Sequence, residues 1–164
     1  MLGPLCSEAL CALRVRNSAA VAACTLRCLA HPLRAVRAAA AAAVTAVAER
    51  GDGGALAEAR AAAHAVSSEA RAAALAALGA LALPPDDSLA ADSRVLPLLL
   101  SRLGGDPAPA VRRQAMQVLR EVCGGADREA LAAIAAAVAD PDVQTRLEVG
   151  AGLLRILQRG CPPP

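Results

Sequence analysis

Residues 95–122 read VLPLLLSRLGGDPAPAVRRQAMQVLREV, and this stretch decides the fold class of the chain. Its first part has Leu96, Leu99 and Leu103 on one face of a helix, spaced by three and four residues. Asp106-Pro107 and Pro109 predict a turn, because proline lacks an N–H and cannot continue a helix. A second apolar helical stripe follows, made of Val111, Ala115, Val118, Leu119 and Val122. The stretch therefore predicts a hairpin of two short helices, the first one bent at Pro97.

At four places along the chain an arginine lies near the start of the second helix of such a predicted hairpin. Arg37, Arg71, Arg112 and Arg146 are 34, 41 and 34 residues apart. A period of this length indicates a helical solenoid, in which each repeat packs on its neighbours. The longer middle interval coincides with the Pro- and Asp-rich residues 83–91, which read as a loop.

The stretch 95–122 resembles a HEAT repeat, through a proline in the first helix (Pro97), an aspartate at the turn (Asp106) and Val111-Arg112 after it. The resemblance implies an all-α, armadillo-type fold, a right-handed α-α superhelix of about four HEAT-like hairpins. The array is expected over residues 18–158, after an N-terminal helix or incomplete repeat (1–17) and before a Pro-rich tail (159–164). Its units are expected at residues 18–50, 54–82, 92–123 and 126–158.

The same resemblance assigns a structural role to the arginines. In that family the turn aspartate and the arginine six residues later commonly link neighbouring repeats. Asp106, Arg112, Asp140 and Arg146 match this pattern, and Arg37 and Arg71 take the arginine position in the first two units. His31 and Ala65 replace the aspartate there, so the ladder is expected to be incomplete in the N-terminal half. The alternative is that the arginine column binds anions or a phosphate backbone.

Composition points to the same fold class. Hydrophobic residues make up 56% of the 164 residues, yet Phe, Tyr and Trp are absent. Roughly a quarter of the residues are Ala, the best helix former, whereas strand-favouring aromatic residues are missing. Because each Ala buries little area, the core is expected to depend on scattered Leu, Val and Ile.

Charge restricts the choice of partner and compartment. The formal net charge is +2, too small to imply a nucleic-acid partner by itself. Residues 1–48 contain Glu8 and five arginines, so an array that binds nucleic acid through its basic N-terminal half is kept as an alternative. That Arg- and Ala-rich segment also leaves organelle targeting open, beside a cytoplasmic, intracellular location. The sequence contains no run of 18 uncharged apolar residues, so we expect no membrane span.

Cys24, Cys28 and His31 are a candidate metal site, although their spacing is not that of a C-x-x-C zinc knuckle. They are spaced for one helix face, with Cys6 and Cys11 upstream, and thiolates with an imidazole could hold zinc. The competing interpretation is that these are free cysteines packed as small hydrophobes. We favour the latter and expect no metal, cofactor or catalytic residue, since no hydrolase, P-loop or metalloprotease motif occurs.

These observations favour a non-enzymatic scaffold or adaptor that binds another protein through the concave face of a short solenoid, which the second helices of the repeats build. The alternative from another class is a bilin lyase-like protein or chaperone acting on a protein-bound chromophore, although the chain has no aromatic residue to stack on a tetrapyrrole. The predicted partner-binding residues lie on the last two second helices: Arg113, Gln117, Arg120, Glu121, Leu147, Glu148, Leu154 and Arg155.

The final helix, over residues 142–158, carries one apolar stripe more than a core requires. Leu147, Ala151 and Leu154 lie where the preceding unit has Arg113, Gln117 and Arg120. A helix that ends an array normally presents a polar outer face. We therefore expect this face to be covered by a second copy, by a further repeat of a longer chain or by a bound partner.

Overall fold

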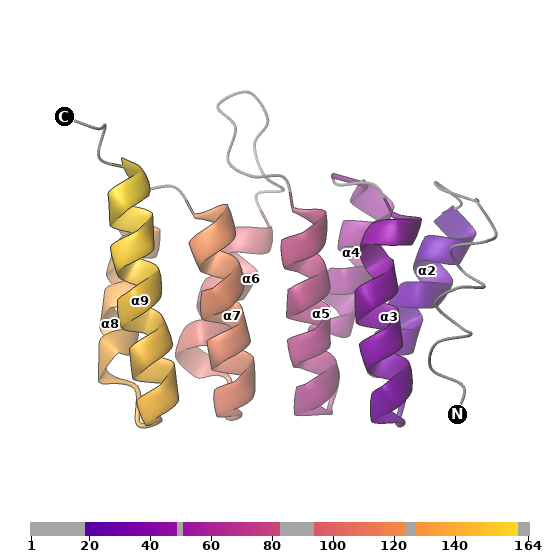
Figure 1. The fold of residues 1–164 in the computed structure, drawn as a ribbon, viewed down its shortest axis with the longest axis horizontal. Helices are drawn as coiled ribbons and strands as arrows, with labels where there is room; N and C mark the ends of the chain where they lie inside the picture. The colour runs from indigo at the N-terminus through magenta and orange to yellow at the C-terminus, as the bar shows by residue number, and fades with distance from the viewer. Residues whose placement is uncertain (1–18, 49–50, 83–93, 124–126, 161–164) are drawn as a thin grey trace. The chain divides into compact units, whose positions relative to one another are not determined.

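A computed structural model describes residues 19–48, 51–82, 94–123 and 127–160. All regular elements in these ranges are helical and none is a strand, so the predicted all-α class is confirmed. The chain divides into two compact units, Met1–Ala82 and Leu83–Pro164, and each is described by itself. Figure 1 shows the helices of both units.

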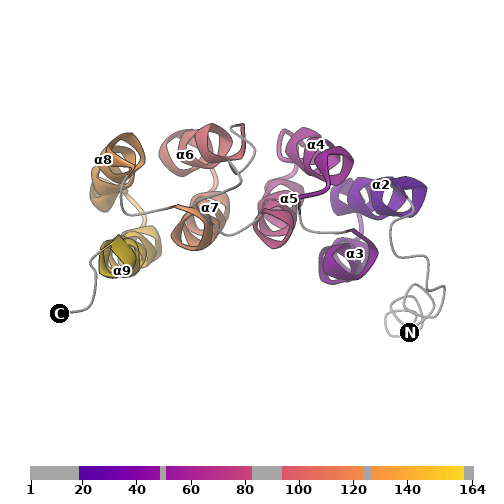
Figure 2. The same ribbon diagram turned by 90° about the horizontal axis from the view of Figure 1, so that it is seen from above.

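The first unit contains two helical hairpins. One consists of α2 (Ala19–Arg27), which continues into the 3-10 turn η1 (Cys28–Ala30), and α3 (Arg34–Val47). The other pairs α4 (Gly53–Ala62) with α5 (Ser68–Leu81). Within this unit α2 packs on α4 and α3 packs on α5, so the first helices form one layer and the second helices another (Figure 2).

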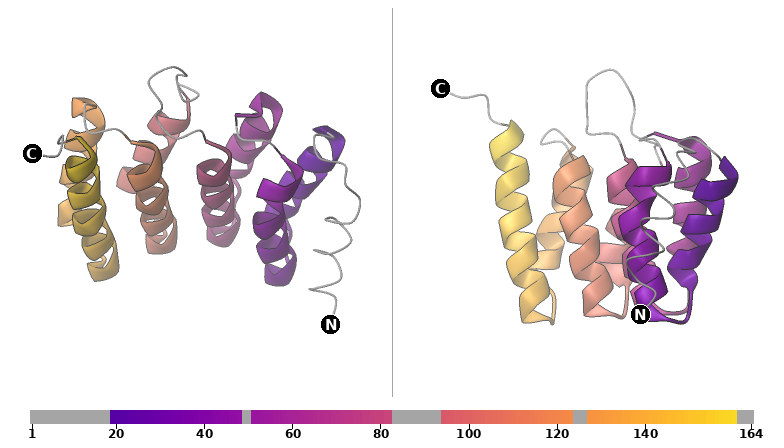
Figure 3. Two further views of the ribbon diagram at one scale, coloured as in Figure 1. Left: turned by 45° about the horizontal axis from the view of Figure 1, so that its top comes forward. Right: turned by 45° about the vertical axis from the view of Figure 1, so that its right-hand side comes forward.

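The second unit repeats this arrangement. One hairpin pairs α6 (Val95–Gly105) with α7 (Pro109–Val122). The other consists of α8 (Arg128–Ala136), the 3-10 turn η2 (Ala137–Ala139) and α9 (Val143–Gly160). Here α6 packs on α8 and α7 packs on α9. Helices α7 and α9 lie side by side in both views of Figure 3. Two layers of two helices each therefore result.

Local sequence explains where several helices begin. The side chains of Asp52, Ser67 and Asp127 accept hydrogen bonds from backbone N–H groups three residues later, at 2.9, 3.3 and 2.9 Å. Such N-caps satisfy donors that a helix leaves unpaired. Pro109 is the first residue of α7, where its fixed φ suits the helix and its missing N–H costs nothing.

Gly51 connects the two hairpins of the first unit. Its φ of 80° lies in the left-handed region, which glycine adopts without steric cost. From this position its N–H donates to the carbonyl of Leu81 at 2.8 Å. The connection after the first hairpin is thereby attached to the end of the second.

Leucine supplies much of the core in both units. The largest fully buried side chains of the first unit are Leu26, Leu29, Val44, Leu75, Leu78 and Leu81, and those of the second are Leu99, Leu103, Met116, Leu119, Ile134 and Ile156. The small alanines between them, such as Ala59, Ala74 and Ala115, are buried as well. Alanine thus lets the helices approach closely, and each buried leucine removes more apolar area from water than an alanine does.

The helix faces differ in detail from those predicted. In α6 the buried stripe is Val95, Leu99 and Leu103, while Leu96 is only half-buried. In α7 Val122, predicted to be part of the core stripe, is only half-buried, whereas Met116, which is not part of that predicted stripe, is fully buried. Apolar residues outnumber the positions on one helix face in these segments, so tertiary packing selects among them.

Two helix boundaries also differ. Because α6 begins at Val95, Pro97 is its third residue and lies within the first turn, where an N–H has no acceptor in the helix anyway. The reason for expecting a bend there is removed. Helix α9 extends to Gly160, beyond the predicted end at residue 158. The predicted helix over residues 1–17 lies outside the described residues, as do residues 161–164 of the predicted tail.

None of the helices in the described ranges is both long and apolar enough to cross a membrane.

Candidate functional site

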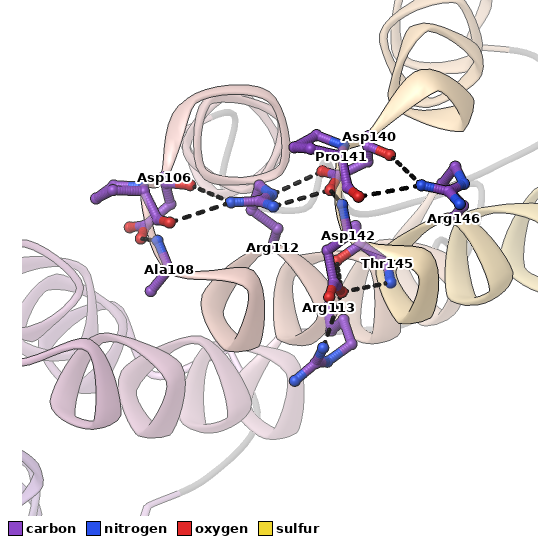
Figure 4. Close-up of polar contacts among 10 residues, drawn as sticks. Asp106, Ala108, Arg112, Arg113, Asp140, Pro141, Asp142, Thr145 and Arg146 are labelled. Carbon is purple, nitrogen blue, oxygen red and sulfur yellow. Dashed lines mark hydrogen bonds and ion pairs between the residues drawn. The ribbon is translucent and has the colours of Figure 1, made fainter.

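The guanidinium of Arg112 joins the two hairpins of the second unit (Figure 4). Its Nε donates to Asp140 Oδ2 at 2.6 Å and its Nη2 to Asp140 Oδ1 at 2.8 Å. Its Nη1 donates to the carbonyls of Asp106 and Pro107, in its own turn, at 2.8 and 3.3 Å. One side chain therefore closes the α6–α7 turn and binds the α8–α9 turn.

Burial makes this contact electrostatically strong. Arg112 and Asp140 are both buried, and a two-pronged arginine–carboxylate pair is among the strongest polar contacts in proteins. The hydrogen bonds from Arg112 hold the pKa of Asp140 below its ordinary value, although burial acts in the opposite direction. The same bonds raise the pKa of Arg112. Asp140 also accepts the N–H of Asp142 at 2.8 Å, so its own turn is stabilised by the charged form.

The three other arginines of the column hold their own turns in the same way. Arg37 Nη1 donates to the carbonyls of His31 and Pro32, both at 2.8 Å. Arg71 Nη1 donates to the carbonyls five and six residues before it, at 2.8 and 3.0 Å. Arg146 Nη1 donates to the carbonyls of Asp140 and Pro141 at 2.8 and 3.1 Å. One side of every guanidinium in the column is therefore occupied by backbone.

The first unit has a weaker version of the link between hairpins. Ala65 lies where the second unit has Asp140, so no carboxylate of that turn meets Arg37. Glu69, in the first turn of α5, is the carboxylate near Arg37. The pKa of Glu69 is lowered chiefly by a hydrogen bond from the Ser67 hydroxyl, with a smaller contribution from the charge of Arg37.

A row of polar contacts extends the link along α7 and α9. Arg113 bonds Asp142 at 2.9 Å, and the Gln117 amide donates to Glu148 at 3.3 Å. Arg120 lies 3.8 Å from Glu148. Near the helix ends Glu121 pairs with Arg155 at 3.8 Å and with Arg159 at 3.2 Å. The predicted partner-binding residues of α7 thus contact α9 or Asp142 just before it. Arg113, Gln117 and Arg120 are half-buried, whereas Glu121 is exposed.

Sequence reasoning missed two members of this row. Asp142 binds Arg113 and also accepts from the N–H and hydroxyl of Thr145, both at 2.8 Å, which lowers the pKa of Asp142. Its place just before α9 could have identified it as a capping residue. Arg159 donates to the carbonyl of Arg120 at 2.7 Å. It lies beyond the predicted end of its helix, so no signal in the sequence placed it there.

The outer face of α9 is apolar and exposed. Leu147 and Leu154 are 62% and 58% exposed, and Val143 and Leu157 are about as open. Ala151 lies between the leucines and is exposed as well. A shallow depression of about 400 Å³ is lined by Ala151, Leu154, Arg155, Gln158 and Arg159. The predicted second stripe of this helix therefore faces away from the rest of its unit.

The cysteine and histidine candidates do not converge in the part of the chain that is described. Cys24 is exposed and Cys28 is half-buried, and neither forms a disulfide. His31 Nδ1 accepts the N–H of Leu33 at 3.1 Å. No cluster of three His, Cys, Asp or Glu residues within the described ranges could hold a metal ion. Cys6 and Cys11 lie outside those ranges.

No protein-family model, curated protein or solved structure matches this chain. The resemblance to HEAT repeats therefore rests on the sequence pattern alone.

Proposed function

We propose that this protein is a non-enzymatic scaffold that binds another protein through the second helices of a HEAT-like, right-handed array of helical hairpins. The observation that carries the proposal is the exposed apolar stripe of α9, above all Leu147 and Leu154. Contiguous apolar residues on a protein surface with polar residues around them mark interaction sites more often than scattered ones do. Arg155, Gln158 and Arg159 form such a polar border here.

The polar row on α7 supports the same interpretation. Arg113, Arg120 and Glu121 keep partly exposed side chains while they pair with α9. A partner lying across both helices would meet pre-positioned charges at the rim and leucines at the centre, the usual anatomy of an interface. The proposed surface comprises Arg113, Gln117, Arg120, Glu121, Leu147, Glu148, Leu154 and Arg155.

Affinity capture with charged variants tests this function. The tagged wild type is expected to retain a discrete protein in near-stoichiometric amount. The double variant Leu147→Glu, Leu154→Glu is expected to lose that protein while keeping its helical content by circular dichroism. Val66→Glu is the matched control, because Val66 is fully exposed and lies in the first unit. Equal capture by wild type and double variant would refute the proposed surface.

Two other results would refute the proposed class. A coloured chromophore adduct retained by the wild type would favour a bilin lyase-like protein or chaperone. Nucleic acid that co-purifies and is released by salt would favour a nucleic-acid-associated array.

A hydrophobic dye gives a faster version of the test. We expect the wild type to bind the dye and the double variant to bind less of it, since Leu147 and Leu154 are the two most exposed large apolar side chains of α9. Val66→Glu should leave the dye signal nearly unchanged. Equal signals from all three proteins would mean that the α9 stripe is not an accessible apolar surface.

A further inference from the structure

Helix α9 repeats the structure of α7 with an offset of 34 residues. The Nη1 of Arg146 binds the carbonyls five and six residues before it, as the Nη1 of Arg112 does. Thr145 and Val149 are buried, like their counterparts Val111 and Ala115. The two helices thus have equivalent faces, and what α7 does with each face can be compared with what α9 does.

The guanidinium of Arg146 is used on one side only. In Arg112 the Nε and Nη2 atoms bind the carboxylate of Asp140, which the next hairpin supplies. Arg146 has its two backbone acceptors and no carboxylate among the described residues. In the first unit a carboxylate of the next hairpin, Glu69, likewise lies in the field of Arg37. A direct contact between this arginine and a carboxylate of the following hairpin is therefore seen in the second unit, for Arg112 and Asp140.

The face of α9 around Arg146 corresponds to the face by which α7 binds α9. On α7 that face consists of Arg113, Met116, Gln117, Arg120 and Glu121, which contact α9 residues. The equivalent residues of α9 are Leu147, Gly150, Ala151, Leu154 and Arg155, all of them exposed. This face continues the geometry of an existing interface but replaces most of its charges with apolar groups.

We infer that the α9 face binds a helical hairpin of a partner polypeptide, whose turn presents a carboxylate to Arg146 and whose facing helix presents apolar side chains to Leu147 and Leu154. This inference rests on the proposed function, because both use the two leucines. It adds the structural class of the partner and one specific ion pair.

The chain's own last hairpin does not fit this description. In the place of the partner it would bring Asp142 and Glu148 toward Leu147 and Leu154, and Arg155 toward another Arg155. Like charges and buried unpaired carboxylates oppose association. Its Gly152, which accommodates Met116 in the existing interface, would face Gly150, around which there is open space. The partner therefore needs apolar residues and a larger side chain at these positions.

The inference is tested with the whole chain extended at its C-terminus by a second copy of residues 123–160. In the version called the matched copy, the copy carries Glu148→Leu, Gly152→Leu and Arg155→Glu. These substitutions make its last helix complementary to Leu154, Gly150 and Arg155 of the parent α9. Covalent linkage gives the copy a high effective concentration at the α9 face. The substitutions give peptides of the copy's last helix their own masses, so that their amide exchange can be followed separately by mass spectrometry.

We expect the matched copy to be protected from exchange. Protection should fall about tenfold or more when the copy also carries Asp140→Ala, a change that leaves the parent chain untouched. Arg146→Ala in the parent should have a similar effect, and the two changes together should cost little more than either alone. Exchange in the parent's own α9 shows whether Arg146→Ala has unfolded that helix.

Three outcomes would overturn the inference. The first is a matched copy without protection. The second is protection that does not depend on Asp140 of the copy or on Arg146. The third is a parent chain that forms dimers lost in Leu147→Glu, Leu154→Glu, since a second copy would then cover the face. If protection of the copy does not depend on the Arg146–Asp140 ion pair, this inference fails but the proposed function does not. If the double variant Leu147→Glu, Leu154→Glu captures the partner protein as well as the wild type does, the proposed function itself is refuted.

Discussion

The side chain of Arg112 is surrounded by acceptors, with two carbonyls of its own turn on one side and the Asp140 carboxylate on the other. Removing it leaves the buried carboxylate of Asp140 without its guanidinium partner. We expect Arg112→Ala to lower the free energy of unfolding by about 3 kcal/mol, because breaking a buried pair strands the remaining charge. Urea unfolding followed by circular dichroism measures this loss.

Arg155→Ala is the matched control for that prediction. Arg155 also pairs with an acidic residue of α7, Glu121, but at 3.8 Å and on the exposed surface. An exposed pair of this kind contributes about 0–1 kcal/mol. If both variants lost the same free energy of unfolding, burial would not make the Arg112–Asp140 pair stronger than the exposed Arg155–Glu121 pair.

The lowered pKa of Asp140 predicts how its contribution depends on pH. A carboxyl whose folded pKa lies below its unfolded value of about 3.8 stabilises the fold fully above that value and loses this effect as pH falls through the folded pKa. The difference in unfolding free energy between wild type and Asp140→Asn should therefore be constant near neutral pH and shrink below about pH 4. A difference that stays unchanged down to the acid unfolding transition would contradict the prediction.

At the scale of elements, two glycines of α9 have opposite surroundings. A Cβ added at Gly150 would meet nothing within 4 Å, whereas one added at Gly152 would meet the Met116 methyl. Gly150→Ala should stabilise the protein by about 1 kcal/mol through helix propensity. Gly152→Ala should lack this gain, because buried Met116 has to be displaced. Thermal unfolding of the two variants compares them, and equal stabilisation would show that α7 and α9 are not in close contact there.

The order of helices and turns could be predicted because their signals are local. Proline at Pro107 and Pro109, and apolar stripes on both sides, are properties of a few neighbouring residues. The burial of Val95 instead of Leu96 was beyond prediction, since VLPLLL offers apolar residues on more than one face. Contacts between elements were equally hidden. The pairs Arg113–Asp142 and Glu121–Arg159 depend on how α7 and α9 are rotated against each other, which spacing along the chain does not specify.

For the whole molecule, the state of the arginines bears on nucleic-acid binding. The formal net charge is +2, and the four column arginines each use one side of the guanidinium for backbone carbonyls. We expect no binding of a labelled single-stranded oligonucleotide by fluorescence anisotropy at roughly physiological salt, where non-specific affinities depend on several free cations. Binding that weakens steeply with added salt would contradict this and direct attention to the basic residues 1–48.

The pairing of Arg112 with a carboxylate 28 residues further along the chain has a consequence for protein synthesis. Domains begin to fold from the N-terminus while the ribosome is still extending the chain. When α7 has emerged from the ribosome, Arg112 can already bind the carbonyls of its own turn, but Asp140 is still inside the exit tunnel and cannot reach it. The α6–α7 hairpin therefore spends an interval of synthesis with the Nε and Nη2 atoms of Arg112 lacking their carboxylate. The emergence of the α8–α9 hairpin supplies it and links the two hairpins in the same step.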